Sequence, residues 1–205
     1  MNHFNQLANS WDTPEKIELS AHYAKEISFF LHEEKLKILE VGCGTGLLGS
    51  QFVKNENQLV GVDTSLGMLE IFNKKFDGIP YVKSYFCNLE NEKLDEDNFN
   101  LVLSSMAFHH LVNPLEMVRK LKDFTQEDGL ICIIDLDKED GSFHPDPAKM
   151  GVHHFGFSKE QVASWGKLTG LHLLAYKVIH NISKNDKSYP IFLVVFKKIK
   201  EGSYE

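Results

Sequence analysis

The stretch Glu40-Val41-Gly42-Cys43-Gly44-Thr45-Gly46 decides the fold of this chain. It completes a short apolar run over 37–41 and precedes a leucine-containing segment over 47–54. Glycine has no Cβ and tolerates positive φ, so a glycine-rich turn lets the backbone approach a ligand closely. Unpaired N–H groups at the start of a helix attract polar or negative groups. The stretch therefore predicts a strand, a ligand-binding turn and a helix over 47–54.

Strand-like and helix-like runs alternate outward from this turn. Buried strands are expected at 37–41, 58–63, 81–86, 99–104 and 129–135, and amphipathic helices at 14–31, 66–76, 115–124 and 158–169. Such alternation is typical of a parallel sheet covered by helices. Two further strands, 171–180 and 189–198, are joined by a short polar turn and must be antiparallel. We therefore expect a doubly wound, Rossmann-like α/β fold with a seven-stranded sheet, mostly parallel, closed by a C-terminal antiparallel hairpin.

Composition limits the organisation and the partners of the chain. Its 205 residues, 42% hydrophobic, are enough for one core, so we expect a single domain over 1–205. The net charge of −7 argues against nucleic-acid and membrane partners, which need a basic face. Three widely spaced cysteines and the lack of a long apolar run predict a cytoplasmic protein. We expect a monomer or homodimer.

The ligand of the glycine turn is ambiguous from the turn alone. Gly44-Thr45-Gly46-Leu47-Leu48-Gly49 fits a dinucleotide fingerprint, and Asp63 follows at the usual distance of about 20 residues. Glu40, however, would repel a pyrophosphate and would attract an ammonium group. A carboxylate at Asp63 can bind the ribose diol of either ligand. A nicotinamide (NAD)-dependent oxidoreductase therefore stays open at this point.

The chain resembles the class I S-adenosylmethionine-dependent methyltransferases, particularly the branch with small-molecule and quinone-biosynthesis enzymes. The resemblance covers nearly the whole chain and is carried by Glu40 to Gly46, Gly61-Val62-Asp63-Thr64-Ser65-Leu66-Gly67-Met68-Leu69, Cys87-Asn88-Leu89 and Phe99-Asn100-Leu101-Val102-Leu103-Ser104-Ser105. It implies methyl transfer from S-adenosylmethionine to a small-molecule acceptor, with S-adenosylhomocysteine as product. The alternatives are the oxidoreductase and a non-catalytic S-adenosylmethionine-binding protein.

The resemblance also implies which residues bind the cofactor. Glu40 and the glycine turn would hold the methionine end, Asp63 the ribose, and Asn88 with Leu89 the adenine, although the family often has aspartate where Asn88 stands. Segment 1–32 would form a helical lid. The full expected set is Trp11, Glu40, Gly42, Cys43, Gly44, Thr45, Gly46, Asp63, Thr64, Met68, Asn88, Leu89, Ser104 and Ser105. Met68 fits core packing equally well, and Trp11 fits a surface contact.

Histidines gather after the later strands, where an α/β sheet places its reacting groups. They are His109, His110, His144, His153 and His154, the last three in or beside the 136–157 connection that we expect at the acceptor site. Histidine can accept a proton near neutral pH, so we predict His144 and His154 first, then His109, as catalytic residues. Each also fits an ordinary hydrogen-bonded loop histidine. Three imidazoles with Asp135 or Asp137 could instead hold zinc or iron, but the spacing of 144, 153 and 154 matches no known ligand pattern, so we predict no metal site.

Overall fold

A computed structural model describes residues 3–33, 35–54 and 56–200, so positions 1 and 2 of the predicted lid lie outside it. The chain divides into two compact units, residues 1–94 and residues 95–205, and each is described by itself. One domain over 1–205 stays a prediction. Within the described ranges, no helix combines the length and the apolar character that crossing a membrane requires.

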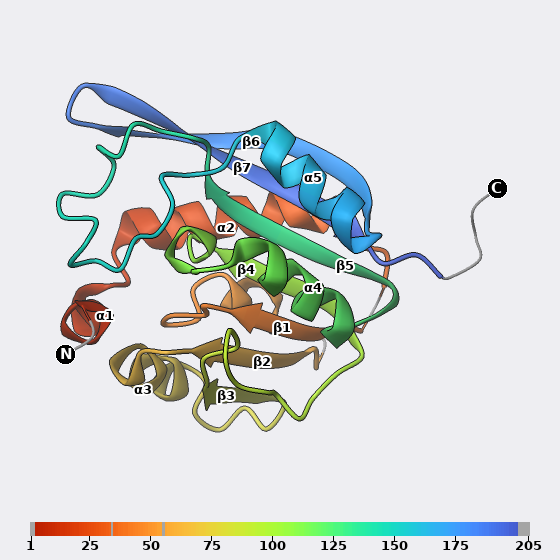
Figure 1. The fold of residues 1–205 in the computed structure, drawn as a ribbon. Coiled ribbons are helices and arrows are strands. Elements are labelled where there is room, and N and C mark those ends of the chain that lie inside the picture. Colours follow the sequence, from red (N-terminus) through yellow and green to blue (C-terminus); the bar gives the residue numbers. More distant parts are fainter. Residues whose placement is uncertain (1–2, 34, 55, 201–205) are drawn as a thin grey trace. The chain divides into compact units, whose positions relative to one another are not determined.

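The first unit holds three parallel strands in the order β3-β2-β1 (Figure 1). Its elements are α1 (His3–Leu7), a 3₁₀ turn η1 (Ala8–Ser10), α2 (Pro14–Ser28), β1 (Lys37–Val41), η2 (Gly49–Phe52), β2 (Gln58–Asp63), α3 (Leu66–Lys75) and β3 (Val82–Phe86). The register places Glu40 beside Gly61 and Asp63 beside Phe86. Glu40 and Asp63 therefore lie near the carboxyl ends of two neighbouring strands, β1 and β2.

Helix starts in this unit follow their capping residues. The Thr13 side chain accepts a hydrogen bond from the Lys16 N–H, and Pro14 occupies the first turn of α2. The Ser65 hydroxyl accepts from the Met68 N–H at the start of α3. The Thr13 side chain therefore caps α2, and the Ser65 side chain caps α3.

The helix expected over 47–54 was wrong. Only the 3₁₀ turn Gly49–Phe52 forms there. Gly49 disfavours a helix, and the Phe52 carbonyl accepts from the Asn57 side-chain amide at 2.9 Å and from the Lys54 N–H instead of continuing a helical ladder. The segment is also pinned because Asn57 accepts from the Leu36 N–H at 2.8 Å. The chain thus returns to β2 after a short turn.

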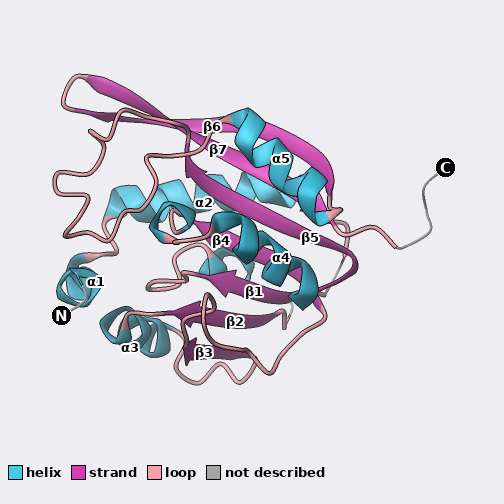
Figure 2. Cartoon of the chain, in the orientation of Figure 1, coloured by secondary structure: helices cyan, strands magenta, loops and turns pink. Residues whose placement is uncertain are grey.

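The second unit holds four strands in the order β4-β5-β7-β6, with β4 and β5 parallel and the last two antiparallel (Figure 2). Its elements are β4 (Phe99–Ser105), η3 (Phe108–His110), α4 (Pro114–Phe124), β5 (Thr125–Leu136), α5 (Lys159–Thr169), β6 (His172–Lys184) and β7 (Lys187–Lys197). Asn185 and Asp186 turn the hairpin with φ of 51° and 58°, as tight hairpin turns require. The predicted α/β class is confirmed, with seven strands, mostly parallel and antiparallel at the C-terminus.

Burial in the second unit is continuous along its two central strands. Residues 130–136 of β5 and 191–196 of β7 are all buried. Strands covered on both faces read as unbroken apolar runs, which is the pattern these two segments show in the sequence. Helix α5 begins after Ser158, whose hydroxyl accepts from the Gln161 N–H, and ends at Gly170 with φ of 69°. Both ends agree with the predicted helix.

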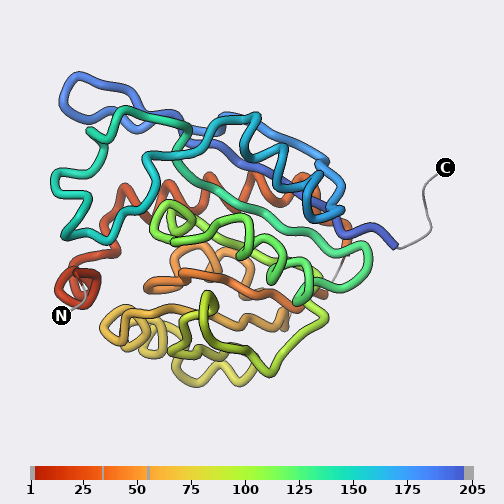
Figure 3. The backbone as a smooth tube through the Cα atoms, in the orientation of Figure 1, coloured from red at the N-terminus to blue at the C-terminus, as the bar shows by residue number. Residues whose placement is uncertain are grey.

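A long connection, residues 137–158, runs between β5 and α5 (Figure 3). It is tied to the β6–β7 hairpin, because Lys184 Nζ donates to the Phe143 carbonyl at 2.7 Å and Lys187 pairs with Asp140 at 2.7 Å. The Ser142 and Tyr189 hydroxyls also lie 2.8 Å apart. These bonds hold residues 140–144 in place although no helix or strand forms there, and they fix the position of His144.

Candidate functional site: a glycine-turn site and a histidine cluster

The glycine turn after β1 adopts backbone conformations that favour glycine. Gly42, Gly44 and Gly46 have φ of 68°, 53° and 74°. The N–H groups of Gly42 and Cys43 both donate to the Val62 carbonyl, at 2.8 and 3.1 Å, which ties the turn to β2. A Cβ at Gly46 would lie 2.7 Å from the Phe72 and Phe76 rings, whereas a Cβ at Gly44 would meet only Met68 Sδ, at 4.0 Å. Gly44 therefore borders open space.

Asp63, at the end of β2, is held by the turn itself. Its Oδ2 accepts from the Gly44 N–H and its Oδ1 from the Ser65 N–H, both at 2.8 Å. Burial raises the pKa of Asp63 above its usual value, and the backbone N–H groups of Gly44, Ser65 and Thr64 oppose that rise. A carboxylate has about four acceptor positions, so these contacts do not use all of them. The side chain is therefore oriented and can still bind a ligand.

Glu40 is a buried carboxyl on β1. It is 3% exposed, and among the described residues its Oε2 has no hydrogen-bond partner. Burial raises the pKa of Glu40 to about 8, while the Gly49 N–H and the Lys75 ammonium oppose the rise and Asp63 adds to it. Because an unpaired buried charge is costly, a cation delivered beside Glu40 would stabilise its ionised form.

Glu40, residues 42–46 and Asp63 together are called the glycine-turn site. Within it Cys43 has a packing role: its Sγ lies so close to β2 that a Cβ at Gly61 would approach it to 2.9 Å. Burial raises the pKa of this thiol well above its usual value. Met68 is 2% exposed and Thr64 is exposed. Met68 thus forms part of the core beneath Gly44.

Two residues that the sequence analysis missed fasten the N-terminal segment to this site. Asn5 Oδ1 accepts from the Ser65 hydroxyl at 2.6 Å and from the Gly67 N–H at 3.0 Å. Asp12 accepts from the Thr45 hydroxyl and pairs with Lys75 at 2.8 Å. No local pattern indicated these roles, because both side chains bind partners far away in the sequence.

The predicted lid residue Trp11 packs within the N-terminal segment. Its ring meets Phe4 edge-on with centroids 5.9 Å apart, and Lys16 Nζ lies 3.3 Å from the ring centre. Asn88, after β3, uses its Oδ1 to accept from the Glu90 N–H at 3.0 Å, and Leu89 is 3% exposed. An amide oxygen has two acceptor positions, so Asn88 keeps one for a ligand.

In the second unit, Ser104 and Ser105 are the last two residues of β4, and His109 follows shortly after them. Ser104 is buried and Ser105 half-buried. His109, on η3, is 1% exposed, and its Nδ1 lies 2.7 Å from Asp135 Oδ1 on β5. The same carboxylate accepts from the Leu136 N–H at 2.7 Å and from the His109 N–H at 3.3 Å. The carboxylate therefore fixes the orientation of the His109 ring.

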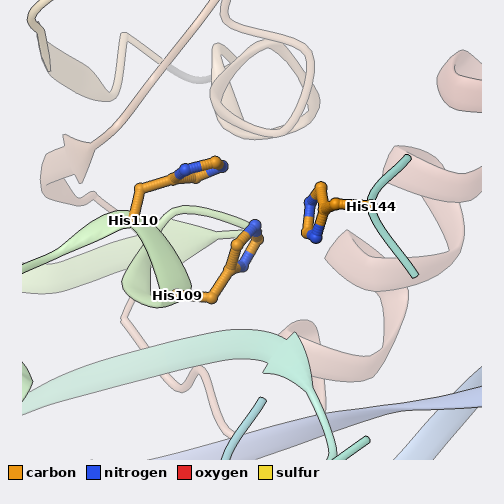
Figure 4. A group of neighbouring side chains, drawn as sticks. All are labelled: His109, His110 and His144. Atoms are coloured by element: carbon orange, nitrogen blue, oxygen red, sulfur yellow. The ribbon is translucent and has the colours of Figure 1, made fainter. Parts of the chain in front are cut away.

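His110 and His144 join His109, and the three are called the histidine cluster (Figure 4). Ring centroids are 4.2 Å apart for His109 and His110 and 4.9 Å for His109 and His144. His110 Nδ1 lies 3.0 Å from the Gly151 carbonyl. Burial, with the neighbouring histidines, lowers the pKa of His110 and of His144 to about 4. Both rings are therefore neutral at pH 7.

His154, predicted alongside His144, has different neighbours. Its ring packs on Phe157 with centroids 5.3 Å apart, and its backbone N–H donates to the His109 carbonyl at 3.1 Å. The structure therefore gathers His144 with His109 and His110, and His154 contributes its backbone to the same region. His110 was in the predicted group of histidines but not among the predicted catalytic residues.

Part of this chain is similar to known methyltransferases. A methyltransferase-domain family model matches residues 39–133. An uncharacterised methyltransferase of Schizosaccharomyces pombe is 31% identical over 160 residues, covering 71% of this chain and 56% of the relative. The ubiquinone/menaquinone biosynthesis C-methyltransferase UbiE of Campylobacter jejuni is 25% identical over 156 residues, covering 68% of this chain and 65% of the relative. The chain thus spans between half and two thirds of these relatives.

Solved structures share the fold. A chain in the complex of the Haloferax volcanii Trm112 methyltransferase activator with a methyltransferase has a TM-score of 0.81 and 15% identity, covering 98% of this chain and 99% of that one. The family match includes the whole glycine-turn site as well as β4, η3 and most of β5. Residues 39–133 therefore match the methyltransferase-domain family, and the chain shares the fold of solved methyltransferase structures, as its glycine turn predicted.

Proposed function

We propose that the chain transfers a methyl group from S-adenosylmethionine to a small-molecule acceptor. The observation that carries this proposal is the buried Glu40 carboxyl, whose Oε2 has no hydrogen-bond partner among the described residues, beside a turn of three glycines. S-adenosylmethionine brings an ammonium group that would pair with this carboxylate. A dinucleotide would bring a pyrophosphate, whose negative charge Glu40 would repel.

The residues of the glycine-turn site fit this cofactor. Glu40 would hold the ammonium, and Gly44 would let the backbone approach the methionine because no side chain fills its open face. Asp63 would accept from the ribose hydroxyls through the acceptor capacity that its N–H contacts leave. Asn88 and Leu89 would face the adenine, with Thr64 and Met68 beside Asp63 and Gly44. The turn itself is shaped by Gly42, Cys43, Thr45 and Gly46. We keep Ser104 and Ser105 assigned to the methionine end of the cofactor.

The bound cofactor supplies an activated methyl group on its sulfonium. What this chain contributes is binding, orientation and exclusion of water, which dominate when the leaving group is already activated. Asn5 and Asp12 fasten the N-terminal segment to the loops after β1 and β2. We propose that this segment, with Trp11, covers the cofactor.

The residues that we propose to contact the methyl acceptor are histidines of the second unit. His109, His144 and His154 remain our candidates there, and Asp135 orients His109 as a carboxylate orients a general base or a metal ligand. The name of the Campylobacter relative, a quinone-biosynthesis C-methyltransferase, supports a small acceptor. The net charge of −7 argues against a nucleic-acid or membrane partner. We propose a cytoplasmic monomer or homodimer.

Calorimetry with S-adenosylmethionine and S-adenosylhomocysteine tests the proposal. Wild type should bind both saturably at one site. Asp63→Ala should weaken binding more than about tenfold, because hydrogen bonds to a charged group contribute about 1.5–3 kcal/mol. Asp123→Ala, at an exposed position on α4, is the matched control and should bind like wild type.

Three outcomes would count against it. Saturable binding of a nicotinamide dinucleotide with none of S-adenosylmethionine would favour the oxidoreductase. Equal binding by wild type and Asp63→Ala would show that Asp63 does not bind the ribose. Cofactor binding without methyl transfer to any member of a quinone and phenol panel would favour a non-catalytic binding protein.

A further inference from the structure

The histidine cluster collects three metal-ligating side chains from two segments far apart in the sequence. His109 and His110 come from η3, and His144 comes from the 137–158 connection. One ring nitrogen from each lies within 4.8 Å of the others. Figure 4 shows the three rings turned toward a common space. This trio differs from the 144, 153 and 154 set that the sequence suggested and dismissed.

The hydrogen bonds behind the cluster determine which nitrogens carry lone pairs. Asp135 Oδ1 and the Gly151 carbonyl oxygen are acceptors, so Nδ1 of His109 and Nδ1 of His110 must carry the proton. In a neutral ring Nε2 is then the nitrogen with the lone pair. A ligating histidine nearly always donates its other ring N–H to a carboxylate or a carbonyl in this way. Two of the three rings therefore already have the outer partners of a metal site.

We propose that one ring nitrogen each of His109, His110 and His144, Nε2 in the case of His109, binds a divalent transition-metal ion, with zinc as the leading candidate. Imidazole suits zinc, copper, iron and nickel, whereas magnesium and calcium prefer oxygen ligands. Zinc binds histidine at about 2.0–2.1 Å, so three ligating nitrogens lie roughly 3.4 Å apart. The candidate nitrogens lie within 4.8 Å of one another, so binding would require them to move closer by up to about 1.4 Å.

The coordination that results has an open position. Three protein ligands leave a fourth site for water or for an oxygen of a bound molecule, which is the arrangement of catalytic rather than structural zinc. Asp135 supplies a buried negative charge behind His109, while Lys184 adds positive charge near His144. If the chain acts as proposed above, a metal there would lower the pKa of an acceptor hydroxyl and remove the need for a histidine base. Metal binding itself does not depend on that function.

The experiment uses the whole chain without a polyhistidine tag, stripped with a chelator and then titrated with Co²⁺. Cobalt in a tetrahedral histidine site absorbs visible light, and Zn²⁺ should displace it. Wild type should bind one ion per chain. His110→Ala and His144→Ala should each weaken Co²⁺ binding by more than about 100-fold, since loss of even an outer partner costs about 10–100-fold.

His172→Ala is the matched control, because His172 is an exposed histidine on β6 outside the cluster. It should bind Co²⁺ as wild type does. A wild type without saturable Co²⁺ absorption, or either cluster variant that binds like wild type, would overturn the proposal, and so would equal loss in the control. Thermal unfolding of the same preparations shows that the variants are folded, and calorimetry with S-adenosylmethionine is run beside it. Failure of wild type in that second assay would count against the methyltransferase proposal only.

Discussion

In residues 1–94 the glycine-turn site takes its groups from the ends of two neighbouring strands, whereas in residues 95–205 the histidine cluster takes its groups from η3, β5 and a long connection. Backbone conformation determines the first: Gly44 donates to Asp63, and Gly42 donates to Val62. Side chains held by distant partners determine the second, as in the His109–Asp135 bond. Changes in the first site should therefore disturb the fold as well as cofactor binding, and changes in the second should mainly disturb metal affinity.

The largest expected effect is a difference in stability between substitutions at two glycines of the same turn. Gly46→Ala should destabilise the chain by about 2–5 kcal/mol, because a positive φ and a clash with Phe72 and Phe76 add together. Gly44→Ala should cost only about 1–2 kcal/mol for its φ, since its face is open. Urea unfolding measures both, and calorimetry should show that Gly44→Ala nonetheless loses cofactor binding. Equal stability losses would refute this division of roles.

Glu40 should make stability depend on pH. Its folded pKa of about 8 lies above the ordinary 4.5, so the folded chain keeps a proton that the unfolded chain releases between those values. The contribution is complete below pH 4.5 and is lost as pH rises to about 8, with a slope of up to about 1.4 kcal/mol per pH unit. Lys75, Asp63 and the Gly49 N–H face this carboxyl.

Thermal or urea unfolding from pH 5 to pH 8.5 measures this slope. Glu40→Gln should flatten it, because an amide does not titrate. Saturating S-adenosylmethionine should also flatten it, because its ammonium favours the ionised carboxylate. A slope that persists in Glu40→Gln would assign the effect to another group.

Asp135 should act as a positioning residue for the histidine cluster. Asp135→Asn should weaken Co²⁺ affinity by about 10–100-fold, because the His109 ring loses its anionic partner. Asp137→Asn, two residues later, is the control and should leave the affinity unchanged. The cobalt titration distinguishes this role from a structural one, since simple destabilisation would lower the melting temperature without changing affinity in the folded chain.

The smallest effect should come from the N-terminal fastening. Asn5→Ala removes the acceptor for Ser65 and Gly67, and each lost hydrogen bond costs about 1 kcal/mol. We expect several-fold weaker S-adenosylhomocysteine binding through faster dissociation, measured by stopped-flow fluorescence of Trp11 and the second tryptophan. Asn181→Ala, on the exposed β6 strand, should dissociate like wild type. Unchanged dissociation in Asn5→Ala would mean that the segment does not cover the cofactor.

The parts that sequence reasoning predicted correctly depend on local patterns. Apolar runs predicted β1, β2 and β4 within one or two residues, and Ser158 predicted the start of α5. The helix after the glycine turn failed because a local pattern could not show that the Asn57 side chain would bind the Phe52 carbonyl. The roles of Asn5 and Asp12 were missed for the same reason.

The sequence by itself determined the strand-turn-strand unit that carries Glu40, Gly44 and Asp63, because neighbouring strands and the backbone preferences of glycine are encoded within a few residues. Only the tertiary structure decided which histidines meet. His144 reaches His109 because Lys184 holds the connection at the Phe143 carbonyl, and Asp135 orients His109 from another strand. Such contacts depend on the packing of segments dozens of residues apart, and no local periodicity records them.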